Sequence, residues 1–101
     1  MLFRSAVSVS GIWDGASETA RLTIIPLSDP KVKVAHYEVR FCPGASYKTA
    51  NEETIGRVAD GATVFETTVG LTASGAVALF RVYTVTETGN EKGSATVKVT
   101  R

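Results

Sequence analysis

Residues 36–42 read HYEVRFC, and this stretch decides the class of fold. Tyr37, Val39 and Phe41 alternate strictly with polar or charged residues, which is the period-two pattern of a strand buried on one face. A second stretch, residues 78–86 (ALFRVYTVT), repeats the alternation. Two such strands, far apart in the sequence, predict an antiparallel sheet with one face on a core and the other in water.

Five further stretches carry similar features. They are rich in Val, Thr and Ile and are bounded by turn formers such as Asp14-Gly15 and Asp60-Gly61. These additional predicted strands are 6–13, 19–25, 54–58 (an edge strand), 63–69 and 95–99. No sustained i, i+3, i+4, i+7 pattern is present, so no helix is expected. The prediction is one all-β domain, 1–101, folded as a seven-stranded antiparallel two-sheet sandwich.

The same alternation predicts which side chains face the core. Beyond the opening stretch, the residues expected to point inward are Val7, Val9 and Trp13; Ala20, Leu22 and Ile24; Phe65, Thr67 and Val69; Ala78, Phe80, Val82 and Thr84; and Ala95, Val97 and Val99. Gly15 is expected to tolerate a positive φ in the first turn, because glycine has no Cβ.

Charge and hydropathy exclude two classes of partner. Eleven Lys and Arg residues nearly cancel ten Asp and Glu residues, so no basic field attracts nucleic acid. No apolar run approaches the roughly 20 residues that cross a bilayer, so membrane insertion is not expected. The first five residues lack the apolar block of a signal peptide. Cys42 is the only cysteine, which rules out an internal disulfide and leaves the compartment open.

Three segments carry a family likeness beyond the strand count. Residues 36–41 (HYEVRF) resemble the third strand of fibronectin type III domains, where a Tyr-x-Val-x-aromatic pattern is usual, and residues 80–91 resemble the sixth strand and its turn. Val69-Gly70-Leu71 is similar to the family's entry into the corner before that strand. The likeness covers about residues 18–101 and implies an immunoglobulin-like sandwich. Two positions depart from it: Ile24 replaces the usual Trp, and Ala78 replaces the usual corner tyrosine.

A second likeness lies in two polar stretches. Residues 42–48 (CPGASYK) and 88–94 (TGNEKGS) are similar to the C-terminal sandwich region of small uncharacterised bacterial proteins. This resemblance implies that the chain is part of a longer protein, and it favours an extracellular or cell-surface location. It implies no activity, because a fold of this kind does not specify a function.

Residues with catalytic or metal-binding chemistry are few and dispersed. His36 and Cys42 lie six residues apart on one predicted strand, about 20 Å at roughly 3.3 Å per residue, too far for a Cys–His pair. No set of converging ligands for a metal or cofactor is present. We therefore expect no enzyme, no cofactor and no metal. His36 is expected to be a solvated surface residue, and Cys42 a half-buried structural thiol, with an exposed reactive thiol as the alternative.

The loop carboxylates lack the spacing of a calcium loop. Glu52, Glu53 and Asp60 are therefore expected to be solvated side chains. The glycines form no nucleotide-binding motif.

One surface is a candidate for interaction. The third and sixth strands are neighbours in this fold, so their outward side chains share a sheet face: Leu79, Arg81, Tyr83 and Val85 with His36, Glu38 and Arg40. Apolar residues rimmed by charge often mark association surfaces, and Tyr and Arg are favoured there. The alternative is scattered surface hydrophobic residues, which are normal.

These observations leave two hypotheses. The first is a non-catalytic binding or spacer module, engaged in protein–protein interaction within a larger surface or secreted protein, through this face or through the loops 28–35 and 86–94. The second is a self-associating structural subunit, a dimer, coat or filament, using the exposed face of the sixth strand and the sheet edges.

Overall fold

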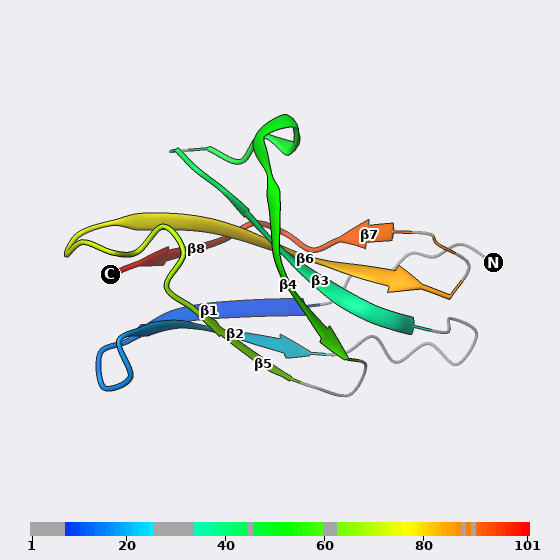
Figure 1. Cartoon of the computed structure of the whole chain (residues 1–101), viewed down its shortest axis with the longest axis horizontal. Helices are drawn as coiled ribbons and strands as arrows, with labels where there is room; N and C mark the ends of the chain where they lie inside the picture. The colour runs from blue at the N-terminus through cyan, green and yellow to red at the C-terminus, as the bar shows by residue number, and fades with distance from the viewer. Residues whose placement is uncertain (1–7, 26–33, 45, 60–62, 88, 90) are drawn as a thin grey trace.

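The computed structural model describes residues 8–25, 34–44, 46–59, 63–87, 89 and 91–101. Within these residues the strands form two antiparallel sheets (Figure 1). One sheet has the order β1-β2-β5, and the other has the order β4-β3-β6-β7, with β8 also pairing with β6. The elements are β1 (Ser8–Asp14), β2 (Thr19–Ile25), β3 (Val34–Cys42), the 3-10 helix η1 (Thr49–Asn51), β4 (Glu53–Ala59), β5 (Val64–Thr67), β6 (Val77–Thr86), β7 (Glu91–Gly93) and β8 (Val97–Thr100).

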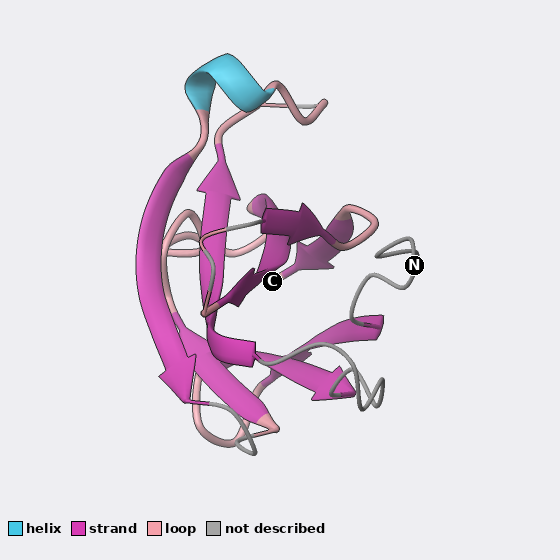
Figure 2. Cartoon of the chain, turned by 90° about the vertical axis from the view of Figure 1, so that its right-hand side faces the viewer, coloured by secondary structure: helices cyan, strands magenta, loops and turns pink. Residues whose placement is uncertain are grey.

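The two sheets face one another around a single core (Figure 2). The inward residues predicted for β2, β3 and β6 are buried, which confirms the all-β two-sheet sandwich. Val9, Trp13, Phe65, Val69 and Val97 are partly buried and pack against that core. Val7 lies outside the described residues. The buried core residues are Ala20, Leu22, Ile24, Tyr37, Val39, Phe41, Val58, Leu71, Ala78, Phe80, Val82 and Val99.

The last predicted strand, 95–99, corresponds to β8, and a further short strand, β7, precedes it. β7 pairs with Tyr83–Val85 of β6, and β8 pairs with Val77–Phe80. Ser94 spans the gap, because its N–H donates to the Val82 carbonyl at 2.8 Å and its Oγ accepts the Val82 N–H at 3.0 Å. The seventh strand is therefore interrupted, and β7 was missed. The prediction that Ala95 faces inward is wrong, since Ala95 is exposed in the interruption.

Small residues let the chain approach itself closely at two places. A Cβ on Gly11 of β1 would lie 2.7 Å from Val97 Cγ1 and 2.9 Å from Leu22 Cδ2. At the corner, Gly70 has a φ of 74°, and a Cβ there would lie 3.2 Å from the Cβ of Ala78. The Ala that replaces the usual corner tyrosine therefore sits where the corner packs tightly.

The first turn differs from the expectation in its backbone. Asp14 Oδ1 accepts the Ala16 N–H at 2.9 Å, which closes the turn after β1. The positive φ of this turn belongs to Glu18 (55°), and Gly15 does not adopt one. The strained residue sits immediately before β2, where the chain reverses into the second strand.

Candidate functional site

The strand pairing brings the predicted interaction residues together on the outer face of the five-stranded sheet. β3 and β6 are antiparallel neighbours, and the paired residues on this face are His36 with Val85, Glu38 with Tyr83, Arg40 with Arg81, and Cys42 with Leu79. The shared face was therefore predicted correctly. The solvent exposure of its individual side chains was not predicted correctly.

Leu79 corrects the expectation of an exposed apolar residue, because it is only 5% exposed. Its neighbour Cys42 is completely buried, although half-burial was expected. Cys42 Sγ accepts the Lys48 N–H at 3.2 Å and lies 3.5 Å from the carbonyl oxygens of Pro43 and Lys48. The described part of the β3–β4 connection, residues 43–44 and 46–52, thus covers the thiol, and we call these residues the strap.

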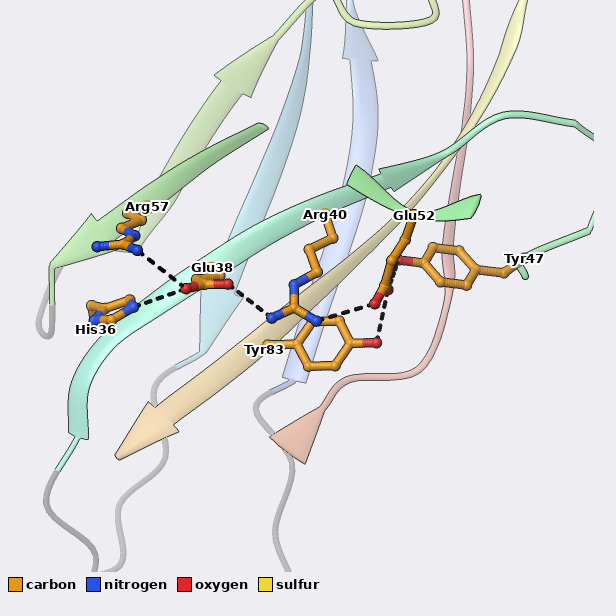
Figure 3. Close-up of polar contacts among 7 residues, drawn as sticks. All are labelled: His36, Glu38, Arg40, Tyr47, Glu52, Arg57 and Tyr83. Atoms are coloured by element: carbon orange, nitrogen blue, oxygen red, sulfur yellow. Dashed lines mark hydrogen bonds and ion pairs between the residues drawn. The ribbon is translucent and has the colours of Figure 1, made fainter. Parts of the chain in front are cut away.

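Glu52, at the end of the strap, corrects the expectation of a solvated carboxylate. Its side chain is 14% exposed. Oε1 accepts hydrogen bonds from the hydroxyls of Tyr47 (2.6 Å) and Tyr83 (2.9 Å), and Oε2 accepts one from Arg40 Nη1 at 3.1 Å (Figure 3). One carboxylate therefore joins the strap to both central strands. Glu53 is exposed as expected, and Asp60 lies outside the described residues.

Arg40 links Glu52 to a second carboxylate. Its Nη2 donates to Glu38 Oε1 at 2.8 Å, and its guanidinium carbon lies 3.9 Å from the ring centroid of Tyr83. His36 Nε2 lies 3.2 Å from Glu38 Oε2, and Arg57 of β4 lies 3.7 Å from the same oxygen. His36 lies on the outer surface as expected, but it is half-buried and hydrogen-bonded to Glu38 and not fully solvated.

A second arginine–aromatic pair holds the strap. The Arg81 guanidinium carbon lies 4.1 Å from the Tyr47 ring centroid, within the range of a cation–π interaction. Arg81 Nε also donates to Thr96 Oγ1 at 3.0 Å, in the interruption between β7 and β8. Arg81 therefore ties the strap to the last strand.

The electrostatics of the cluster favour charged carboxylates and neutral tyrosines. A hydrogen bond from Arg40 lowers the pKa of Glu38 against the effect of partial burial. Burial raises the pKa of Glu52, but hydrogen bonds from Tyr47, Tyr83 and Arg40 outweigh it, so that the pKa is lowered. Burial and the Glu52 carboxylate raise the pKa of both tyrosines. At neutral pH the tyrosines remain donors and Glu52 remains their acceptor.

Sequence reasoning missed the contributions of Tyr47, Glu52 and Arg57 to this face. The only available signal was an aromatic residue within an otherwise polar loop. Cys42 and His36 lie on one strand as expected, with no contact between them among the described contacts. Within the described residues no group of three or more His, Cys, Asp or Glu side chains is placed to hold a metal ion. The described residues also include no helix long and apolar enough to cross a membrane.

Comparison with known proteins finds likeness in structure alone. No family model and no curated protein matches the sequence. Pectate lyase Pel3 from Pectobacterium carotovorum matches with a TM-score of 0.71 and 17% identity, over 93% of this chain and 27% of that one. Pectate lyase PelI from Erwinia chrysanthemi, in complex with tetragalacturonic acid, matches with a TM-score of 0.69 and 21% identity, over 93% and 28%.

A third match has similar length. An Fn3-like protein from Clostridium thermocellum matches with a TM-score of 0.64 and 23% identity, over 93% of this chain and 90% of that one. The chain thus spans about a quarter of the pectate lyase chains and nearly all of the Fn3-like protein. The fold is therefore a fibronectin type III-like sandwich, as the resemblance in the sequence implied.

Proposed function

We propose that the chain is a non-catalytic interaction or spacer module of a larger protein. One observation carries the proposal. A sandwich of this fold makes up about a quarter of two pectate lyase chains and nearly all of a separate Fn3-like protein. A fold that occurs in both contexts suits a self-contained accessory unit. Protein–protein contact through the outer face of the five-stranded sheet is the specific role proposed.

The chemistry of that face supports contact more than catalysis. Its two carboxylates are already paired, since Arg40 lies between Glu38 and Glu52. A general base or nucleophile needs a group that is free to exchange protons near a substrate. Arg81, Tyr83 and Val85 are partly exposed and are residue types suited to a protein partner.

Two assays test the proposal. Incubation of the chain with tetragalacturonic acid should give no unsaturated product in ultraviolet absorbance, and appearance of product would overturn the non-catalytic assignment.

The adjacent domain of the parent protein, supplied separately, should bind the chain in surface plasmon resonance. Arg81→Glu should weaken this binding by about tenfold. The control Arg21→Glu, on the opposite sheet, should leave it unchanged; equal effects would exclude the face.

Self-association is the second candidate, and a different surface favours it. Ile12, Ile25 and Val64 are 59%, 62% and 47% exposed on the outer face of the β1-β2-β5 sheet. Self-association through an apolar face of the sixth strand, as the sequence suggested, is less favoured because Leu79 is buried. Light scattering over a concentration series separates the candidates. A mass that rises with concentration, and falls back in Ile12→Thr, would support self-association, whereas a monomer at millimolar concentration would exclude it.

A further inference from the structure

Two residues on the outer face are buried although they do not pack in the core between the two sheets. Cys42 and Leu79 are cross-strand partners, and both have outward parity on their strands. Both are buried, yet neither belongs to the core cluster between the sheets. Their cover must therefore lie on the outside of the sheet. The strap is the segment whose contacts place it over Cys42, since its backbone surrounds the thiol, and Leu79 is the cross-strand neighbour of that residue.

The described part of the strap is held down by few contacts. Ser46, Lys48 and the residues of η1 are exposed, and η1 buries no side chain. In Figure 2 this turn projects beyond the two packed sheets. Apart from the hydrogen bonds of the Cys42 thiol, the contacts that tie the strap to β3 and β6 come from the side chains of Glu52 and Tyr47. A segment with little buried apolar surface, held by side-chain hydrogen bonds, belongs to the low-stability end of a folded domain.

The hydrogen bonds that the strap side chains make with the sheet converge on the carboxylate of Glu52. Glu52 accepts from Tyr83 of β6 and Arg40 of β3, and it also fixes the orientation of Tyr47, which stacks on Arg81. Charge-assisted hydrogen bonds are the stronger kind, so loss of the charge weakens every contact that Glu52 makes. Figure 3 shows the two tyrosines and Arg40 meeting at this side chain.

We propose that the strap is a latch that opens as a local unit while the sandwich stays folded, and that the Glu52 carboxylate is its catch. Opening uncovers Cys42 and Leu79 beside Tyr83, and so converts a polar, internally paired face into a partly apolar one. In the closed state the strap itself covers these residues. The latch is independent of what the face binds, so it stands or falls separately from the proposed function.

The test measures access to the Cys42 thiol with Ellman's reagent under native conditions. Glu52→Gln should speed labelling by about tenfold, because the neutral amide is a weaker acceptor for the three donors. The matched control is Glu66→Gln, a carboxylate of β5 that pairs with Arg21 on the opposite sheet. It should label within about twofold of the wild-type rate. Equal rates for the two variants would overturn the proposal.

Urea separates latch opening from global unfolding. Opening of the strap exposes little surface, so the labelling rate should change little with urea below the unfolding transition. A rate that rises as steeply as the unfolding equilibrium constant would show that the thiol reacts only in the unfolded chain, and would overturn the proposal. If Glu52→Gln does not fold, Tyr83→Phe removes one of the hydrogen bonds and should give a smaller acceleration with an unchanged far-ultraviolet spectrum. No acceleration in a folded Tyr83→Phe would then count against the latch.

Discussion

At the scale of the residue, Thr84 in the centre of β6 places an unpaired hydroxyl in the core, which lowers the stability of the fold. Its side chain is completely buried on the inner face, and within the described residues its hydroxyl has no hydrogen-bond partner. An unpaired buried hydroxyl costs about 1–3 kcal/mol. Thr84→Val keeps the branched shape and removes the hydroxyl, so we expect the free energy of unfolding in urea to rise by about 1 kcal/mol.

Thr67→Val is the control for this substitution. The Thr67 hydroxyl accepts the Val69 N–H at 3.1 Å, so the same change should lower the stability there by about 1 kcal/mol. If Thr84→Val destabilised the chain as much as Thr67→Val, Thr84 would have a partner and the interpretation would fail.

Gly11 is required by the closeness of β1 to the last strand. Gly11→Ala places a methyl group 2.7 Å from Val97 Cγ1 and 2.9 Å from Val99 Cγ2. Overpacking of this kind costs about 1–3 kcal/mol, and chemical denaturation should show that loss. Gly15→Ala is the control, because a Cβ there meets nothing within 4 Å. Equal stability of the two variants would mean that β1 can move away without cost.

At the scale of the element, Arg101 connects three parts of the chain that are distant in sequence. Its guanidinium lies 4.8 Å from the Trp13 ring centroid, and Nη1 donates to the Leu71 carbonyl at 2.9 Å. Its backbone bonds to Gly75 and Ala76. The side chain therefore joins the end of the last strand to the corner before β6 and to β1.

Removal of this side chain should loosen all three parts together. Arg101→Ala should lower the thermal midpoint by several degrees, corresponding to about 1–2 kcal/mol, because the Leu71 carbonyl loses its charged donor. Lys98→Ala, an exposed change on β8, is the control and should have little effect. An unchanged midpoint in Arg101→Ala would show that the backbone hydrogen bonds hold the corner unaided.

The elements also show where local pattern stops being informative. β2, β3 and β6 follow strict alternation, and their inner faces were predicted correctly. The last predicted strand covers only the segment in which Val97 and Val99 alternate, and β7 ahead of it was missed. Between β7 and β8, Ser94 is held to β6 by its N–H and Oγ, which bond to the carbonyl and the N–H of Val82. Those bonds depend on the neighbouring strand and leave no period in the sequence.

At the scale of the whole molecule, stability should fall in acid. The pKa values of Asp14, Glu38 and Glu52 are lowered in the folded state. The unfolded chain therefore binds more protons than the folded chain as the pH falls through the unfolded pKa values, about 4. The stabilisation is complete above that range and is lost as the pH falls through the lowered folded values.

Thermal melts between pH 7 and pH 2.5 measure this dependence. The midpoint should be nearly constant near neutral pH and should drop once the pH is below about 4.5. Glu38→Gln removes one of the shifted groups, so its midpoint should fall less steeply over the acid range, although it starts lower. A wild-type midpoint that stayed level, or rose, from pH 5 to pH 3 would contradict the assignment of these ion pairs.

The sequence by itself determined the sandwich, because alternation along one strand already states which side of that strand is apolar. With the resemblance to fibronectin type III domains, which makes the third and sixth strands neighbours, it also predicted a common face for His36, Glu38, Arg40, Tyr83 and Arg81. Only the tertiary structure decided the state of that face. Whether Cys42 meets water depends on where the β3–β4 connection folds. Glu52 becomes a shared acceptor only when β6, some 30 residues away in sequence, lies beside it. Contacts of that range arise from the packing of distant segments, and no local periodicity encodes them.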